Sequence, residues 1–401
     1  MSAYELWFYL PIPQTRREMY KLPQELTDHI IDFLHDDLET LRQVSLVSRA
    51  WVESSRLHLF ETFQIRYPHV NELDKDDLAT VSKYVRKLIY SLPDCDPAKA
   101  SLVLSNFRKA KIHTVIISRR HQFSQSSIYK CFSTFPCAMI TSLEFRGLLC
   151  QTQTFLAAVL LFPNIDNLTV VASQWHGPEF LELGEVIAGG VVFPSFRGRF
   201  RLTNPRDRLS WNFGQAKPLC ILARIPIRFH TVSCYINKHN LGNLTSFLNA
   251  CGSTVRRILL EAAYREPSPF LHFNALSHVT LSVKALPVVE LLVPCAKLEE
   301  LHLGDGFVDI PNAFICRVLD SISSRRLTHL SIELSDKVQE GVDWEALDNA
   351  LVRLQERQHI GSPFMVKIST PLPAEVVQDC LPRFRDQGPL FIGCGGCPSR
   401  W

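Results

Sequence analysis

The stretches Leu298-Glu-Glu-Leu-His-Leu303 and Leu327-Thr-His-Leu-Ser-Ile332 decide the fold. Each has an apolar residue, two variable residues, a second apolar residue, one variable residue and a third apolar residue. Alternating apolar and variable positions are typical of a strand that is buried on one face. Further copies occur at Val85–Tyr90, Ile112–Ile117, Ile140–Phe145, Ile165–Val170, Phe229–Cys234, Val255–Leu260 and Leu276–Leu281, and Val366 with Ile368 would close the series.

The spacing of these copies indicates an internal repeat. Their middle apolar residues lie roughly 20 to 29 residues apart, which is the period of leucine-rich repeats, except between Leu168 and Val232. In that gap we expect one degenerate unit around Phe200 and Leu202. Helix-like stretches lie between the copies at 154–161, 244–248, 314–319 and 344–352.

The pattern resembles the strand half of leucine-rich repeats, although the regularly placed asparagine of that family is mostly missing. We therefore expect an α/β fold in which residues 80–372 form an irregular leucine-rich-repeat-like α/β solenoid of parallel strands and crossover helices. An ordinary doubly wound α/β domain also alternates strands with helices and remains an alternative. The sequence has no strand-linked glycine-rich phosphate loop that would favour it.

A short amphipathic helix is expected after Leu22-Pro23, because proline suits the first turn of a helix. Leu26, Ile30 and Leu34 would form its apolar stripe, with Asp28, His29 and Asp32 on the other side. Asp36 or Asp37 can cap a second helix. That helix would carry Leu38, Leu41, Val44, Val47 and Trp51, and a third would hold Leu57, Leu59 and Phe60.

These residues resemble the F-box, which joins a Leu-Pro opening, fixed apolar spacing and a close such as Val44-Ser-Leu-Val-Ser-Arg-Ala-Trp51. The resemblance implies that residues 20–63 form a helical unit that binds the Skp-type adaptor of cullin–RING ubiquitin ligases. The positions carried over are Leu22, Pro23, Leu26, Ile30, Leu34, Val44, Val47 and Trp51. Sequence alone does not divide them between a partner-binding face and the core beneath it.

Three short helices cannot bury so many apolar side chains among themselves, so a partner or a neighbouring domain is expected to cover some of them. The alternative is that the helices merely cap the C-terminal domain. The other segments would be an N-terminal tail at 1–19 and a C-terminal tail at 373–401.

Composition narrows the class of protein. Hydrophobic residues make up 46% and charged residues 21% of the 401 residues, as in a globular protein with a core. The net charge of +3 is too small to attract nucleic acid or an acidic membrane by itself. No secretory signal or apolar run long enough to span a bilayer is recognised. The 12 cysteines are therefore expected to be reduced core residues in a cytoplasmic or nuclear protein.

Two clusters have compositions that suit binding chemistry. Cys394-Gly-Gly-Cys397, with Cys380, has the spacing of a redox or metal pair, but no second ligand pair follows, so a tail is the preferred interpretation. An arginine-rich stretch could bind RNA or a phosphorylated segment, or it could be a half-exposed edge strand. It contains Arg197, Arg199, Arg201, Arg206 and Arg208, interleaved with Phe196, Phe200 and Trp211.

The sequence thus predicts a non-enzymatic substrate adaptor without cofactor or metal, or else an interaction scaffold with no ligase role. An enzyme of unknown type on an α/β domain is a third possibility. Variable positions on adjoining parallel strands would form one surface for an unknown protein substrate. The substrate-binding candidates are Glu299, Glu300, His302, Thr328, His329 and Ser331. Histidines at or beside the strands could sense pH, namely His113, His230, His278, His302 and His329.

Overall fold

The computed structural model divides the chain into two compact units, Met1–Glu61 and Thr62–Trp401. The expected N-terminal tail at 1–19 lies outside the described residues. The structure describes residues 22–66, 75–91, 97–118, 122–123, 125–147, 149–150, 152–171, 174–175, 194, 196–203, 216–225, 227–236, 241–262, 292–304, 312–334, 342–358 and 364–394.

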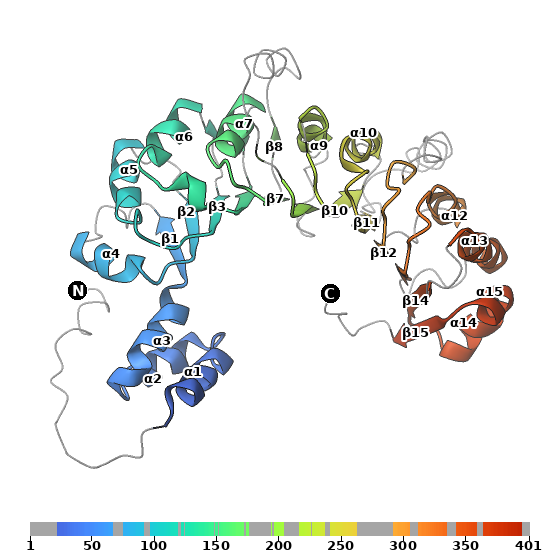
Figure 1. The fold of residues 1–401 in the computed structure, drawn as a ribbon, viewed down its shortest axis with the longest axis horizontal. Coiled ribbons are helices and arrows are strands. Elements are labelled where there is room, and N and C mark those ends of the chain that lie inside the picture. Colours follow the sequence, from blue (N-terminus) through green and yellow to red (C-terminus); the bar gives the residue numbers. More distant parts are fainter. Residues whose placement is uncertain are drawn as a thin grey trace, which may run out of the picture. The chain divides into compact units, whose positions relative to one another are not determined.

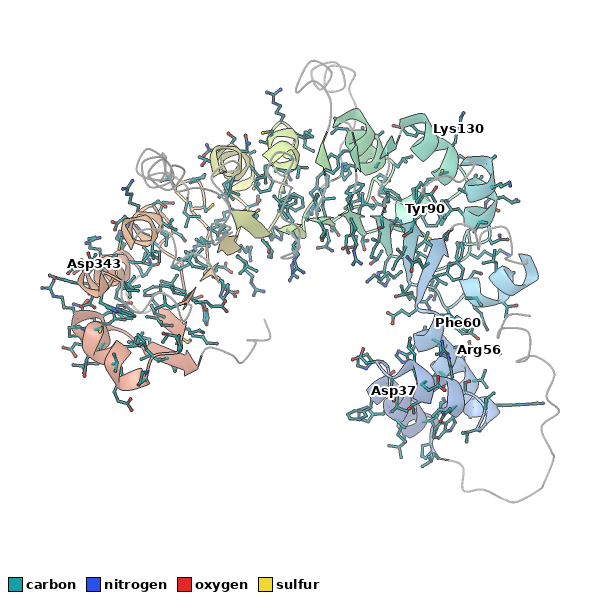
Figure 2. The ribbon with its side chains drawn as sticks, turned by 180° about the vertical axis from the view of Figure 1, so that it is seen from behind. Asp37, Arg56, Phe60, Tyr90, Lys130 and Asp343 are labelled. Atoms are coloured by element: carbon teal, nitrogen blue, oxygen red, sulfur yellow. The ribbon has the colours of Figure 1, made fainter. Side chains whose placement is uncertain are left out.

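The first unit consists of the helices α1 (Gln24–Phe33), α2 (Leu38–Val44) and α3 (Arg49–Phe60). Pro23 directly precedes α1, and its carbonyl accepts the N–H groups of Leu26 and Thr27 at 3.1 Å each. Asp37, labelled in Figure 2, caps α2 by accepting the Thr40 N–H at 3.0 Å. Both helix starts confirm the expected positions, because each uses the residue whose chemistry favours a first turn.

The expected second helix is too long. It was predicted to continue through Trp51, whereas α2 ends at Val44 and α3 begins at Arg49. The Ser45 hydroxyl donates to the Arg42 carbonyl at 2.6 Å, and the Ser48 hydroxyl accepts the Ala50 N–H at 3.1 Å. Serines that bond to the local backbone end one helix and start the next. Trp51 therefore belongs to the first turn of α3.

The second unit is built on one parallel sheet of 12 strands, which confirms the expected α/β class. Its order follows the chain, and each strand pairs only with its sequence neighbours in this sheet. A doubly wound sheet would reverse its order at a switch point, and the described strands contain no such reversal. The strands are β1 (Thr62–Arg66), β2 (Lys87–Ser91), β3 (Thr114–Ser118), β5 (Ser142–Arg146), β7 (Asn167–Val171), β9 (Arg199–Thr203), β10 (Thr231–Ile236), β11 (Arg257–Ala262), β12 (Glu300–Leu303), β13 (His329–Glu333), β14 (Met365–Thr370) and β15 (Leu390–Cys394).

Helices connect these strands and lie along one face of the sheet (Figure 1). A second parallel sheet contains the two-residue strands β4 (Gln122–Phe123), β6 (Leu149–Cys150) and β8 (Gln174–Trp175). The helices are α4 (Lys75–Ser82), α5 (Pro97–Ser105), α6 (Gln125–Phe132), the 3₁₀ helix η3 (Cys137–Met139), α7 (Thr152–Leu160), α9 (Ala216–Leu222), α10 (Leu241–Cys251), α12 (Asn312–Asp320), α13 (Trp344–Arg357), α14 (Ala374–Cys380) and α15 (Pro382–Gln387).

The core lies between the sheet and these helices. The apolar positions of the repeat pattern point into it; in β2, for example, Leu88 and Tyr90 are buried while Ile89 between them is half-buried on the other face. The hydroxyl of Tyr90, which is labelled in Figure 2, donates to Cys131 Sγ of α6 at 3.0 Å and so joins strand and helix. We call the opposite side of the sheet the helix-free face. It displays the variable positions of every strand side by side.

The sheet extends past both expected limits. It begins at Thr62 in β1 rather than near residue 80, and it ends with β15 rather than near residue 372. The expectation of a tail from residue 373 is therefore wrong for the described residues up to Cys394. Val377 of α14, Leu381 between the two helices and Phe384 of α15 are buried, so both helices contribute to the core. The Phe384 ring lies 6.1 Å from that of Phe364, directly before β14.

Two of the expected repeat units have different outcomes. The degenerate unit expected around Phe200 and Leu202 is confirmed as β9, which pairs with β7 and β10. In the second case, β11 pairs directly with β12, so Ile258 lies opposite Leu301 and no strand separates them. The copy expected at Leu276–Leu281 lies outside the described residues.

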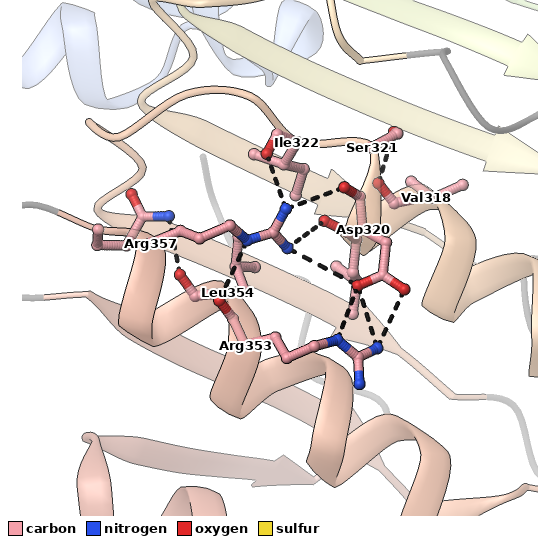
Figure 3. A network of polar contacts seen from close by, with 9 residues as sticks. Val318, Asp320, Ser321, Ile322, Arg353, Leu354 and Arg357 are labelled. Atoms are coloured by element: carbon pink, nitrogen blue, oxygen red, sulfur yellow. Dashed lines mark hydrogen bonds and ion pairs between the residues drawn. The ribbon is translucent and has the colours of Figure 1, made fainter.

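A polar network joins α12 to α13 (Figure 3). Arg353 donates to both carboxylate oxygens of Asp320 at 3.0 to 3.2 Å. Arg357 donates to the carbonyls of Asp320, Leu319 and Ile322 at 2.9, 3.3 and 3.4 Å. The last carbonyls of a helix have no partner within it, so Arg357 supplies donors that the C-terminus of α12 lacks.

Replacing Arg357 with alanine is expected to lower the free energy of unfolding by roughly 1 to 2 kcal/mol, since partly buried carbonyls lose a charged donor. The midpoint of chemical denaturation measures this effect. Arg325→Ala is the control, because Arg325 is exposed and no described residue pairs with its side chain. Equal midpoints for both variants would show that the network does not stabilise the fold.

Among the described residues, no helix has both the length and the apolar character needed to span a membrane.

Candidate functional site

The first unit packs through the polar side of α1. Thr27 and Ile31 are buried, and α1 lies against α3. The Ser54 hydroxyl of α3 donates to the Asp28 carboxylate. One helical turn on, His58 Nε2 lies 2.8 Å from Asp32 Oδ1. Asp28 and Asp32 thus lie opposite the apolar stripe, as the sequence predicts, and that side of α1 faces α3.

These contacts affect the ionisation of Asp28. The hydrogen bonds from Ser54 and then from Gln24 lower the pKa of the Asp28 carboxyl below its ordinary value, because both favour the carboxylate. A carboxyl with a lowered pKa contributes stability above its unfolded pKa and loses it as the pH falls through the folded pKa. The packing of α1 on α3 is thus favoured near neutral pH and weakened in acid.

The apolar side of α1 is left exposed. Leu22, Leu26, Ile30 and Phe33 follow one another at steps of three or four residues, so they lie along one side of the helix and its start. Leu26 is 51% exposed and Phe33 is 86% exposed. We call these four residues the α1 stripe. An amphipathic helix normally buries this side, so the α1 stripe is a candidate contact surface.

More apolar side chains are exposed at the ends of α2. Leu38 starts this helix, and Leu46 and Val47 lie in the turn that follows it; all three are exposed. Together with the α1 stripe, they account for seven of the thirteen exposed large apolar side chains among the described residues. More than half of such side chains thus lie in the smaller unit. This concentration is typical of a protein interface rather than of ordinary surface.

The structure separates the eight F-box-like positions into two groups. The first contains the exposed residues Leu22, Pro23, Leu26, Ile30 and Val47. The second contains the half-buried residues Leu34, Val44 and Trp51. The first group is available to a partner, whereas the second contributes to the packing of the three helices.

Three exposed apolar residues were not among the predicted site residues, namely Phe33, Leu38 and Leu46. Phe33 could have been found from its spacing, because it lies three residues after Ile30. Leu38 and Leu46 could not, since their exposure depends on where α2 begins and ends.

The substrate-binding candidates lie on or beside β12 and β13. Glu300 lies opposite His329, and His302 lies opposite Ser331, in the register of these parallel strands. Both pairs are on the helix-free face. Glu299 and Thr328 each precede a strand, and the Thr328 hydroxyl donates to the Glu299 carbonyl at 3.1 Å. The structure thus brings the six candidates together.

Not all of these side chains can reach a partner. Ser331 is only 3% exposed, so its assignment to a substrate-binding surface is wrong for its side chain. Contacts within the protein already engage others: Glu300 forms an ion pair with Arg257 at 3.0 Å, and His302 Nε2 lies 3.5 Å from Glu333 Oε1. The polar side chains on the β12–β13 part of the helix-free face are therefore largely paired within the protein.

The arginine-rich stretch contributes to β9. Arg199 and Arg201 are exposed, while Phe196, Phe200 and Leu202 are buried in the core. The edge-strand interpretation is wrong, because β9 has a paired strand on each side. The buried phenylalanines also cannot stack on nucleic-acid bases. Arg206, Arg208 and Trp211 lie outside the described residues.

The remaining candidates stay apart. His113 and His230 are exposed and directly precede β3 and β10 in the sequence. His278 lies outside the described residues. Cys394 ends β15, and Cys397 lies outside the described residues.

Within the described ranges, no group of three or more His, Cys, Asp or Glu residues is placed to hold a metal ion. Burial raises the pKa of the Cys295 thiol to about 12, as in a core cysteine that stays protonated.

We compared the chain with models of known protein families and with curated proteins, and neither comparison gave a match.

Proposed function

We propose that this chain is a substrate-recognition adaptor of an SCF-type cullin–RING ubiquitin ligase. The F-box-like helices α1 to α3 would bind a Skp-type adaptor, and a leucine-rich-repeat-like solenoid would bind a protein substrate. The chain itself would catalyse no reaction. The observation that carries the proposal is the exposed α1 stripe at the positions of the F-box resemblance.

The local structure explains why this stripe is exposed. Pro23 starts α1, so Leu22 lies outside the helix, while Thr27 and Ile31 anchor the opposite side to α3. Fully burying a Leu, Ile or Phe side chain is worth roughly 1.5 to 3 kcal/mol. The four side chains of the α1 stripe are 39% to 86% exposed, so covering them would offset several kcal/mol of the cost of association.

The second unit supports the substrate-binding part of the proposal. Strands added in chain order, with helices on one side, agree with the stacked units of a leucine-rich-repeat solenoid. Such stacking places variable side chains of many strands on the helix-free face. A surface of this kind can bind an extended stretch of another protein without a pocket.

Assembly with purified subunits tests the ligase role. We expect the full chain, a Skp-type adaptor and a cullin to elute as one complex in size-exclusion chromatography. A complex with the adaptor that excludes the cullin would favour the alternative, a protein-interaction scaffold without a ligase role. Elution of the chain apart from the adaptor would contradict the ligase role and favour the scaffold as well.

A further inference from the structure

The strongest unexplained feature of the helix-free face is a pair of arginines on β9. Arg199 and Arg201 are two residues apart on one strand, so both side chains leave the sheet on the helix-free side. Both are exposed. Nitrogen-tipped side chains extend from this side of the central strands (Figure 2). Arginine is commonly used to bind carboxylate or phosphate groups.

Neither arginine has an acidic partner among the described residues, in contrast to other arginines of the same face. Arg146 donates to Glu144 of its own strand, and Arg257 lies 3.0 Å from Glu300. These two charges are therefore compensated within the protein. No carboxylate among the described residues compensates the positive charges of Arg199 and Arg201, so the pair is a candidate site for an anionic ligand.

The neighbouring strands surround this pair with neutral polar groups. Arg199 lies opposite Thr231 of β10, and its backbone N–H donates to Asn167 of β7. Arg201 lies between Thr169 and Ser233 in the same two strands. None of these neighbours brings a negative charge that would compete with an anionic ligand. Asn167, Thr169 and Thr231 add amide and hydroxyl groups that can form further hydrogen bonds, whereas Ser233 is buried.

The position of the pair is fixed by the backbone. Asn167 Oδ1 accepts the Arg199 N–H at 2.9 Å. A Cβ on Gly198 would lie only 2.4 Å from that same oxygen, so the close approach requires glycine. β9 is also paired on both sides. The two arginines therefore project from a rigid element and not from a loop.

We propose that Arg199 and Arg201 bind an extended acidic protein segment with carboxylates at alternate positions, Asp/Glu-x-Asp/Glu. Side chains of an extended chain that point the same way are about 6.6 Å apart, which is also the spacing of two arginines at positions i and i+2 of a strand. Each carboxylate would then face one guanidinium. Because this inference names the substrate class for the helix-free face, it rests on the proposed function.

The test uses the full chain without any ligase subunit, so its result is independent of adaptor binding. A fluorescent peptide containing Asp-Val-Asp is titrated with the protein at low salt, and binding is followed by anisotropy. A peptide of equal composition with adjacent aspartates, a peptide with one phosphoserine in place of both aspartates, and oligouridylate serve as comparisons.

We expect the Asp-Val-Asp peptide to bind most tightly, and Arg199→Gln with Arg201→Gln to weaken its binding roughly tenfold or more, because hydrogen bonds between charged groups are lost. Arg257→Gln is the matched control. Arg257 projects from the same face but pairs with Glu300, so this substitution should leave binding unchanged.

Several results would overturn the inference. They are equal binding of the two aspartate peptides, tighter binding of the phosphopeptide or of oligouridylate, and unchanged affinity in the double variant. A circular-dichroism melt of the double variant confirms that any loss is not due to unfolding. Loss of peptide binding in an intact protein that still assembles with a Skp-type adaptor would separate this surface from the α1 stripe.

Discussion

Replacing Leu26 and Phe33 together with glutamate is expected to abolish binding to a purified Skp-type adaptor. Both side chains belong to the α1 stripe, and neither packs in the core of its unit. Central apolar residues of an interface commonly contribute 2 kcal/mol or more each. A buried unpaired carboxylate adds a further cost. The affinity should therefore fall by more than about 100-fold.

The matched control is Leu102→Glu in α5. Leu102 is 54% exposed, as Leu26 is 51% exposed, but it belongs to the second unit. Surface plasmon resonance with immobilised adaptor compares the variants. If the Leu102 variant lost binding as well, general loss of solubility would explain the result. Unchanged binding of the Leu26 and Phe33 variant would exclude the α1 stripe as the docking surface.

Replacing Phe200 with alanine is expected to lower the free energy of unfolding by roughly 3 to 5 kcal/mol, as for other buried phenylalanines. The Phe200 ring is fully buried, and its centroid lies 5.5 Å from that of Phe229 and 4.9 Å from that of Phe247. The loss should be large because the surrounding aromatic side chains cannot fill the space of a whole ring. Urea denaturation measures it.

Phe391→Ala is the control for this experiment. Phe391 lies on the helix-free face of β15 and is 53% exposed, so its truncation should change stability by less than about 1 kcal/mol. Equal effects of the two substitutions would show that β9 does not belong to the central core. The contrast tests whether the arginine-rich stretch is an interior strand.

The sequence predicts most of the strands, because the repeat pattern has a clear physical cause. Positions such as Leu301, Leu303 and Leu330 must be buried together, and their alternation with variable residues defines a half-buried strand. β9 was found in the same way despite its arginines, since Phe200 and Leu202 keep the alternation. The Leu-Pro start of α1 was predictable for a local reason, the fixed backbone of Pro23.

The remaining features depend on contacts between distant residues. Asp28 and Asp32 lie on the polar side of α1, and their contacts with the hydroxyl of Ser54 and the ring of His58 make that side the one that packs on α3. The ends of the sheet were missed for other reasons. β1 carries the repeat pattern in Phe60, Phe63 and Ile65, but the sequence prediction places Phe60 in the third helix. β15 lacks the first apolar residue of the pattern, because Gln387 stands there, so its pairing with β14 is what shows that it is a strand.

Hydrogen exchange of the full chain, with and without a purified Skp-type adaptor, tests the central claim most directly. We predict that adaptor binding slows amide exchange in α1 and in the turn around Leu46 and Val47, and leaves the strands of the second unit unchanged. No slowing anywhere, or slowing confined to the second unit, would contradict the assignment of the α1 stripe as the adaptor-binding surface.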